Sequence, residues 1–161
     1  MYLNLGILIF VGYLLSLLFF IIGIAKISFK SSKLNEIHNI SIIVCVRNGA
    51  LSIKNIINDL KQQYYPGNLE FIIVDDASTD NTKDIINQFV YDDHRFKYFN
   101  TINSKSILKH KKKALEIGIN NSKYEWLLFT DTDCRVNQNW AYEISKNFNY
   151  ADYIIGFSEV N

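Results

Sequence analysis

The chain opens with its longest hydrophobic stretch, residues 5–25, which contains no charged side chain. A helix needs roughly 20 mostly apolar residues to cross the hydrocarbon core of a bilayer. The pattern therefore predicts one transmembrane helix over residues 1–26. Shorter apolar segments with polar breaks follow, which predict a linker at 27–39 and a folded domain at 40–161.

The charges beside this stretch predict its orientation. Lys26, Lys30 and Lys33 follow it directly, and lysines gather on the cytoplasmic side of membrane helices. We therefore expect a single-pass membrane anchor with the domain in the cytoplasm. A cleaved signal peptide is the alternative. A signal peptide has a basic segment before a shorter apolar core, whereas residues 1–4 contain no Lys or Arg.

Five short apolar runs in the domain predict strands, and helical patterns separate them. The predicted strands are residues 41–46, 69–74, 96–99, 126–130 and 153–157. The predicted helices are residues 51–63, a segment around 85–90 that Ser78, Thr79 or Asp80 can cap, residues 109–120, and residues around 140–148. Such alternation is typical of an α/β fold in which helices cover both faces of a parallel sheet.

The same spacing predicts which side chains face the core. Residues 126–129 are apolar at every position, which indicates a strand buried on both faces. The predicted inward side chains of the first and third helices are Leu51, Ile53, Ile56, Ile57 and Leu60, and Ala114, Leu115 and Ile119.

Polar clusters follow three of the predicted strands. Arg47 and Asn48 follow the first strand, Asp75 and Asp76 the second, and Asp131-Thr132-Asp133 the fourth. Open parallel sheets bind ligands beyond the carboxyl ends of their strands. The clusters therefore favour a site for a nucleotide or another phosphorylated ligand.

The two carboxylates of Asp131 and Asp133 lie one residue apart, and like charges that close repel each other. A divalent cation removes this cost, and oxygen ligands suit Mg2+ or Mn2+. The metal would in turn hold an anionic group such as a diphosphate. A polar turn in which Asp133 caps the next helix remains the alternative.

Composition narrows the function classes. A length of 161 residues allows one domain and an anchor, and 48% of the residues are hydrophobic. The net charge of +1 excludes a strongly basic nucleic-acid binder. Cys45 and Cys134 have no metal-binding spacing, so we expect reduced thiols with a structural role.

Four segments together resemble a known family. SIIVCVRNGA, EFIIVDDASTDNT, KKKALEIGI and EWLLFTDTDC, between residues 41 and 134, resemble the nucleotide-binding half of a family 2 glycosyltransferase. The most specific parts are V-D-D-x-S-x-D-x-T at 74–82 and the D-x-D about fifty residues later. The resemblance implies the GT-A fold, a mostly parallel Rossmann-like sheet, and the anchor resembles that of polysaccharide-synthase-like members.

The resemblance also implies roles for single residues. Arg47 and Asn48 match the segment that lines the nucleotide pocket. Asp75 and Asp76 match an acidic pair, one of which hydrogen-bonds the base or ribose, while helix capping is the alternative for the other. Lys111 matches the Lys of K-x-x-A-L near the donor diphosphate, and a solvated lysine is the alternative.

The D-x-D of the resemblance implies that Asp131 and Asp133 bind the metal and that Asp131 also contacts the donor. Asp80 matches the later Asp of the acidic loop, where we expect a cap. The chain departs from the family pattern at three positions: His110 stands where Gly is usual, Gly49 where an acidic residue is common, and Cys45 where Pro is common.

The implied chemistry is metal-dependent, inverting transfer of a sugar from a nucleotide-diphosphate sugar, expected to be a UDP-sugar, by a hexosyltransferase-type enzyme. The implied acceptor is a glycan or lipid in cell-envelope or exopolysaccharide synthesis. A separate carboxylate would act as general base. Beyond Asp133 the carboxylates are Glu143, Asp152 and Glu159, and we assign none of them as the base.

The sequence also lacks a Q-x-x-R-W acceptor motif. We therefore expect a fragment or truncated product whose fifth strand leaves an exposed edge. The alternative function is a catalytically incomplete, membrane-tethered module that binds a nucleotide or a partner. A nucleotidyltransferase of similar architecture would have a Gly-rich phosphate-binding loop after the first strand, and residues 47–50 do not form such a loop. A response-regulator receiver would lack a membrane anchor here.

Overall fold

The computed structural model describes residues 2–28 and 36–156, and its contacts divide the chain into two units, Met1–Lys33 and Leu34–Asn161. The first unit contains helix α1, Tyr2–Ser28. Within it, Gly6–Ile24 is long and apolar enough to cross a membrane, by length and composition only, and its side chains are exposed. The helix runs two residues beyond the predicted end at 26. Most of the predicted linker, residues 29–35, lies outside the described residues.

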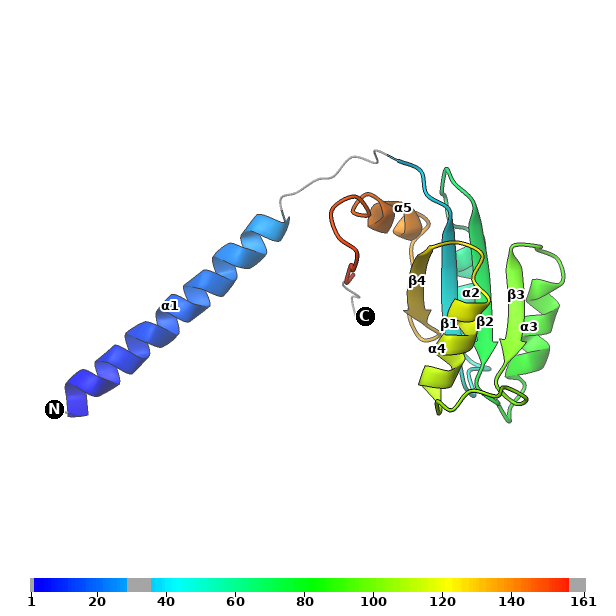
Figure 1. Cartoon of the computed structure of the whole chain (residues 1–161), viewed down its shortest axis with the longest axis horizontal. Coiled ribbons are helices and arrows are strands. Elements are labelled where there is room, and N and C mark those ends of the chain that lie inside the picture. Colours follow the sequence, from blue (N-terminus) through cyan, green and yellow to red (C-terminus); the bar gives the residue numbers. More distant parts are fainter. Residues whose placement is uncertain (1, 29–35, 157–161) are drawn as a thin grey trace. The chain divides into compact units, whose positions relative to one another are not determined.

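The second unit is built on a four-stranded parallel sheet in the order β3-β2-β1-β4 (Figure 1). The strands are β1 Ile40–Val46, β2 Leu69–Asp75, β3 Phe96–Asn100 and β4 Trp126–Asp131. Val46 pairs with Asp75 and Cys45 pairs with Asp131, so the strands end at nearly the same level. The α/β architecture with a parallel sheet is confirmed.

Helices cover both faces of this sheet because the side chains of each strand alternate between them. On one face, α2 (Ile53–Lys61), α3 (Thr82–Val90) and α5 (Trp140–Ser145) contribute to a core that includes Ile42 and Val44. On the other face, Ala114 of α4 (Lys111–Asn120) packs with Ile43, Ile72 and Val74.

Several predicted positions are wrong in detail. The side chain of Leu51 is 97% exposed because α2 begins two residues later, at Ile53. Ile119 is 44% exposed, and the buried residues of α4 are Ala114 and Gly118. Phe129 is 48% exposed because β4 is an edge strand, so it is not buried on both faces.

The predicted fifth strand at 153–157 is also wrong over its described part. Residues 153–156 are irregular, and Phe157 lies outside the described residues. A strand needs a neighbour that supplies backbone hydrogen bonds, and no described segment pairs with residues 153–156. The described residue Ile154 instead packs against the core on the α2 face.

Candidate functional site

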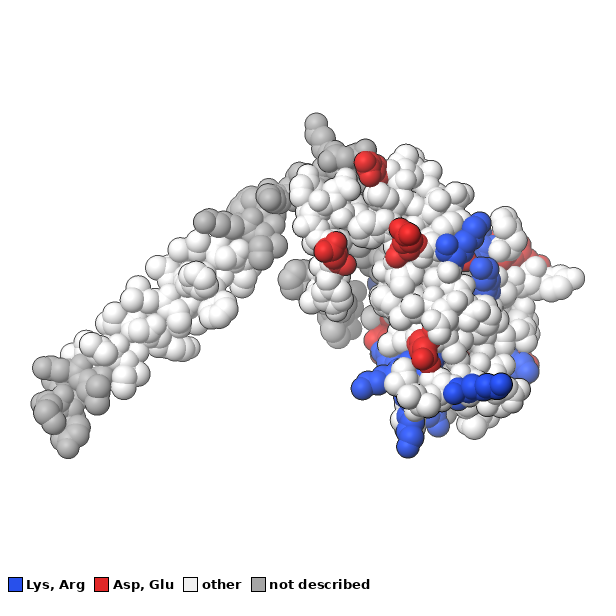
Figure 2. Space-filling model, viewed as in Figure 1, with Lys and Arg blue, Asp and Glu red and all other residues white. Residues whose placement is uncertain are grey.

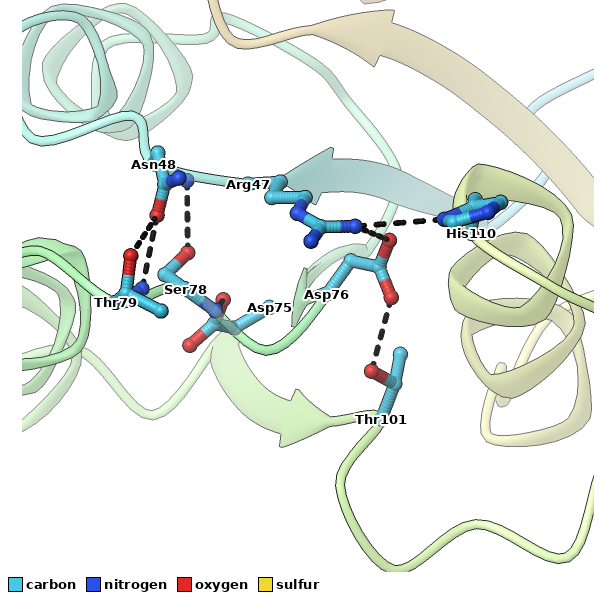
Figure 3. A network of polar contacts seen from close by, with 8 residues as sticks. All are labelled: Arg47, Asn48, Asp75, Asp76, Ser78, Thr79, Thr101 and His110. Atoms are coloured by element: carbon cyan, nitrogen blue, oxygen red, sulfur yellow. Dashed lines mark hydrogen bonds and ion pairs between the residues drawn. The ribbon is translucent and has the colours of Figure 1, made fainter.

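The loops that follow β1 and β2 are joined by hydrogen bonds through Asn48 (Figure 3). The backbone N–H of Asn48 donates to Ser78 Oγ at 2.9 Å, and its Oδ1 accepts from the Thr79 N–H at 2.8 Å. Asn48 has a φ of 52°, a left-handed conformation that Asn tolerates better than most residues. The predicted nucleotide-pocket residue is therefore held by the loop that carries the acidic pair.

Asp75 is buried and has both carboxylate oxygens occupied. Oδ1 accepts from the Ser78 N–H at 2.9 Å, and Oδ2 accepts from the Tyr98 hydroxyl at 3.1 Å. Burial, with the adjacent Asp75 charge, raises the pKa of Tyr98 to about 12. Asp75 therefore shapes the loop, and each of its carboxylate oxygens already has a hydrogen-bond partner.

Asp76 has one oxygen in a strong hydrogen bond and the other in a longer ion pair. Oδ1 accepts from the hydroxyl of the buried Thr101 at 2.9 Å. Oδ2 lies 3.8 Å from Arg47 Nη1, which also lies 3.4 Å from His110 Nδ1 (Figure 3). Of the acidic pair, Asp76 is thus the member that faces Arg47.

Asp80 connects the start of α3 to the loop after β1. Its Oδ1 accepts from the N–H of Thr82, the first residue of α3, and Oδ2 accepts from the Ala50 N–H at 3.2 Å. Hydrogen bonding, first of all from the Thr82 side chain, lowers the pKa of Asp80. Asp80 therefore accepts a hydrogen bond from a backbone N–H in the first turn of α3, as expected for a capping residue, although the residue at the N-cap position is Asn81.

Lys111 and Asp131 form a second cluster at the same edge of the sheet. Lys111 Nζ lies 2.5 Å from Asp131 Oδ1, and both side chains are more than half exposed. The hydrogen bond to Asp131 raises the pKa of Lys111. Cys45 pairs with Asp131 in the register of β1 and β4, and burial raises the pKa of its thiol to about 11. Lys111 therefore has a specific partner in the described structure while its side chain stays largely exposed, so both its donor role and the solvated-lysine alternative stay predictions.

Asp131 and Asp133 are both exposed at the end of β4. The capping interpretation of Asp133 is wrong, because α5 begins at Trp140 and its N-cap is Asn139. Within residues 2–28 and 36–156, no group of three or more His, Cys, Asp or Glu side chains surrounds a metal position. Mg2+ commonly takes one or two carboxylates and completes its ligands with water and phosphate. Two exposed carboxylates fit that kind of binding.

Sequence reasoning missed the pair that anchors the loop after Asp133. Arg135 donates to both carboxylate oxygens of Asp59 in α2, and the Val136 N–H donates to Asp59 Oδ2 at 3.2 Å. The hydrogen bonds from Arg135 lower the pKa of Asp59. The sequence did contain a signal, because Asp59 lies on the apolar face of α2 with Ile56 and Leu60.

The two clusters lie at the carboxyl-end edge of the parallel sheet, as we expected for the polar residues that follow β1, β2 and β4. Several basic side chains lie at the lower end of the domain in Figure 2, the end toward which the strand arrows of Figure 1 point, and a second basic group lies near its upper end. Arg47, Asn48, Asp75 and Asp76 form one connected network. Lys111 and Asp131 form the other. Which of these residues bind a donor or a metal stays a prediction.

Residues 41–159 match the family described as "Glycosyl transferase family 2". This chain belongs to glycosyl transferase family 2. Among curated relatives, it is 31% identical over 120 residues to "Glycosyltransferase GlyG" of Streptococcus pneumoniae, covering 73% of this chain and 38% of GlyG. It is 26% identical over 117 residues to the poly-beta-1,6-N-acetyl-D-glucosamine synthase of Staphylococcus epidermidis, covering 73% and 27%. The chain thus spans about a third of the length of these relatives.

Solved structures of similar fold extend the comparison. S. aureus TarS 1-349 matches with a TM-score of 0.59 and 23% identity, covering 69% of this chain and 32% of TarS. The mannosyltransferase PcManGT from Pyrobaculum calidifontis, solved with GDP-Man and Mn2+, matches with a TM-score of 0.64 and 20% identity, covering 73% and 34%. These likenesses confirm the GT-A fold.

Proposed function

We propose that this family 2 chain forms the donor-binding part of a glycosyltransferase that takes a sugar from a nucleotide-diphosphate sugar. The observation that carries the proposal is the Lys111–Asp131 pair beside the Arg47–Asp76 network at one edge of the sheet. A lysine, an arginine and two exposed carboxylates at strand ends suit a diphosphate, a nucleoside and a metal. Family membership supports this assignment.

In the proposed site, Asp131 and Asp133 hold Mg2+ or Mn2+, and Asp131 also contacts the donor. The bound metal would stabilise the negative charge that develops on the diphosphate leaving group. The pairing of Lys111 with Asp131 supports a role in which its ammonium would neutralise a phosphate oxygen of the donor. PcManGT and a mycobacterial glucosyl-3-phosphoglycerate synthase have both been solved with Mn2+, which supports a divalent ion.

The nucleotide would lie against Arg47, Asn48 and the acidic pair. Asp76 is the proposed ligand-facing member, because the ion pair of its Oδ2 with Arg47 is long, at 3.8 Å. Asp75 acts through the loop, since both its oxygens already accept hydrogen bonds. In this way the backbone of the two loops is ordered before a ligand arrives.

We assign a UDP-sugar as the donor and keep GDP as the tested alternative. TarS has been solved with UDP-GlcNAc, and PcManGT with GDP-Man. The proposed reaction is inverting transfer to a glycan or lipid acceptor in cell-envelope or exopolysaccharide synthesis. No general base for the acceptor hydroxyl is assigned to a residue of this chain.

We further propose that the chain has a membrane anchor at 1–26, a linker at 27–39 and a cytoplasmic GT-A domain at 40–161. The apolar span Gly6–Ile24 supports the anchor. Protease digestion of intact spheroplasts and of inverted vesicles tests the orientation. The domain should be cleaved only in inverted vesicles, and cleavage in intact spheroplasts would contradict a cytoplasmic domain.

A second candidate function is a membrane-tethered module that binds the nucleotide without catalysing transfer. The chain spans 27% to 38% of the length of the first curated relatives, so sugar transfer by the whole relatives is not carried over to it by similarity alone. UDP release from UDP-GlcNAc in the presence of bacterial membranes separates the two candidates. Binding with UDP release supports the enzyme, and binding without release supports the module.

The deciding experiment is calorimetric binding of UDP and GDP to the full chain in detergent, with Mn2+ and with EDTA. Circular dichroism first confirms that the sample is folded. We expect binding that needs the metal and is lost in Asp131→Ala/Asp133→Ala. Asp92→Ala/Asp152→Ala removes two exposed carboxylates elsewhere in the domain and serves as the matched control. Absence of binding by a folded sample, with either nucleotide, would overturn the donor site.

A further inference from the structure

His110 has a backbone conformation that side chains disfavour. Its φ is 53° and its ψ is −142°, a region that is populated mainly by glycine. The residue directly precedes α4, and its carbonyl accepts from the Lys113 N–H at 2.8 Å. A glycine would adopt this turn without steric cost. The chain therefore keeps a histidine here at the expense of backbone stability.

The imidazole of His110 lies against the guanidinium of Arg47 (Figure 3). Arg47 Nη1 lies 3.4 Å from His110 Nδ1 and 3.8 Å from Asp76 Oδ2. Because a guanidinium only donates hydrogen bonds, Nδ1 is the accepting atom of any hydrogen bond across this contact.

This contact completes a chain of polar groups across four elements. It runs from His110 before α4 to Arg47 after β1, then to Asp76 after β2, and ends at Thr101 after β3. The Arg47 side chain is 56% exposed. Apart from His110, the contact that restrains its guanidinium among residues 2–28 and 36–156 is the long ion pair to Asp76. An exposed arginine loses much rotamer freedom when it is held, so an early restraint reduces the entropy lost when a ligand binds.

We propose that His110 is a positioning residue for the donor nucleotide. It holds the Arg47 guanidinium above Asp76, so that the remaining N–H groups of Arg47 point at a polar or anionic group of the bound nucleotide. This inference rests on the proposed function and deepens it. It also explains why a strained non-glycine residue stands at the entrance of α4.

The test compares His110→Gly and His110→Ala with the unchanged full chain in detergent. UDP affinity in the presence of Mn2+ is measured by calorimetry, and Tm by thermal unfolding. We expect His110→Gly to raise Tm by about 2 to 4 °C because it relieves the backbone. The same variant should bind UDP about fivefold more weakly because it frees Arg47. His110→Ala keeps the strained Cβ, so it should weaken UDP binding equally without raising Tm.

A double-mutant cycle with Arg47→Met identifies the path of the effect. Once Arg47 is removed, His110→Ala should change UDP affinity less than twofold. His94→Ala, at an exposed histidine before β3, is the control and should leave both measurements unchanged. Unchanged UDP affinity in His110→Ala, additive effects in the cycle, or a lower Tm together with lower affinity in His110→Gly would overturn the proposal. Failure of the unchanged chain to bind UDP or GDP would instead overturn the proposed function.

Discussion

Arg135 donates two hydrogen bonds to the carboxylate of Asp59, from Nε to Oδ2 at 2.6 Å and from Nη2 to Oδ1 at 2.8 Å. The two residues are 76 positions apart in the chain, and Arg135 follows Asp133 by two residues. Planar, bidentate pairs of this kind restrict orientation as well as distance. The pair therefore attaches to α2 the end of the loop in which Asp131 and Asp133 lie.

Asp59→Asn should lower the free energy of unfolding by about 2 kcal/mol at pH 7, because it removes charged hydrogen bonds from Arg135 and weakens the bond from Val136. Asp59 is 8% exposed, so water only partly replaces these partners. Chemical unfolding followed by circular dichroism measures the loss. Asp92→Asn, at an exposed carboxylate, is the control, and an equal loss there would contradict the assignment.

The same pair predicts a loss of stability in acid. The pKa of Asp59 is lower in the folded state than its usual value of about 3.9. Its contribution is therefore complete above about pH 4 and is lost as the pH falls through the lower folded pKa. The difference in unfolding free energy between the unchanged chain and Asp59→Asn should shrink below about pH 4. A difference that stays constant down to pH 2 would exclude this linkage.

Lys111→Ala should separate binding from stability. The Lys111–Asp131 pair is exposed, and such pairs contribute at most about 1 kcal/mol to folding. We therefore expect Tm to change by less than about 3 °C while UDP affinity with Mn2+ falls about tenfold. Lys112→Ala, at the next exposed position of α4, is the control. Equal effects of the two variants on affinity would show that only overall charge matters.

Tyr98→Phe tests the support behind Asp75. Its hydroxyl donates to a carboxylate that is 3% exposed, so the loss should destabilise the fold by about 1 to 2 kcal/mol. The folded pKa of about 12 exceeds the usual Tyr value of about 10. The contribution is therefore complete below about pH 10 and is lost as the pH rises toward 12. Absorbance at the phenolate band should show one tyrosine fewer titrating near pH 12 in the variant.

Gly118→Val should push α4 away from the sheet. A Cβ at Gly118 would lie 2.6 Å from Ile43 Cγ2 and 3.4 Å from Val74 Cγ2. Overpacking of this kind typically costs about 1 to 3 kcal/mol. Because Lys111 begins α4, the variant should also weaken metal-dependent UDP binding. Gly156→Val, where an added Cβ meets nothing within 4 Å, should leave both Tm and binding unchanged.

Local patterns in the sequence were sufficient to predict the parallel α/β sheet, all four of its strands and the edge at which the polar clusters lie. Periodicity is a property of neighbouring residues, and parallel strands place their carboxyl ends together whatever else surrounds them. For this reason Arg47, Asp76 and Asp131 could be assigned to one edge from the sequence alone.

The tertiary structure determined the exposure, the strand pairing and the side-chain partners of several residues, which sequence periodicity does not specify. Phe129 is exposed because β4 lies at the edge of the sheet, and the apolar run at 153–156 pairs with no described strand. Asp75 and Asp76 are identical neighbours in the sequence, yet only the positions of Tyr98, Thr101 and Arg47 distinguish them. Partners such as these come from distant segments, and their geometry exists only once the whole chain is packed.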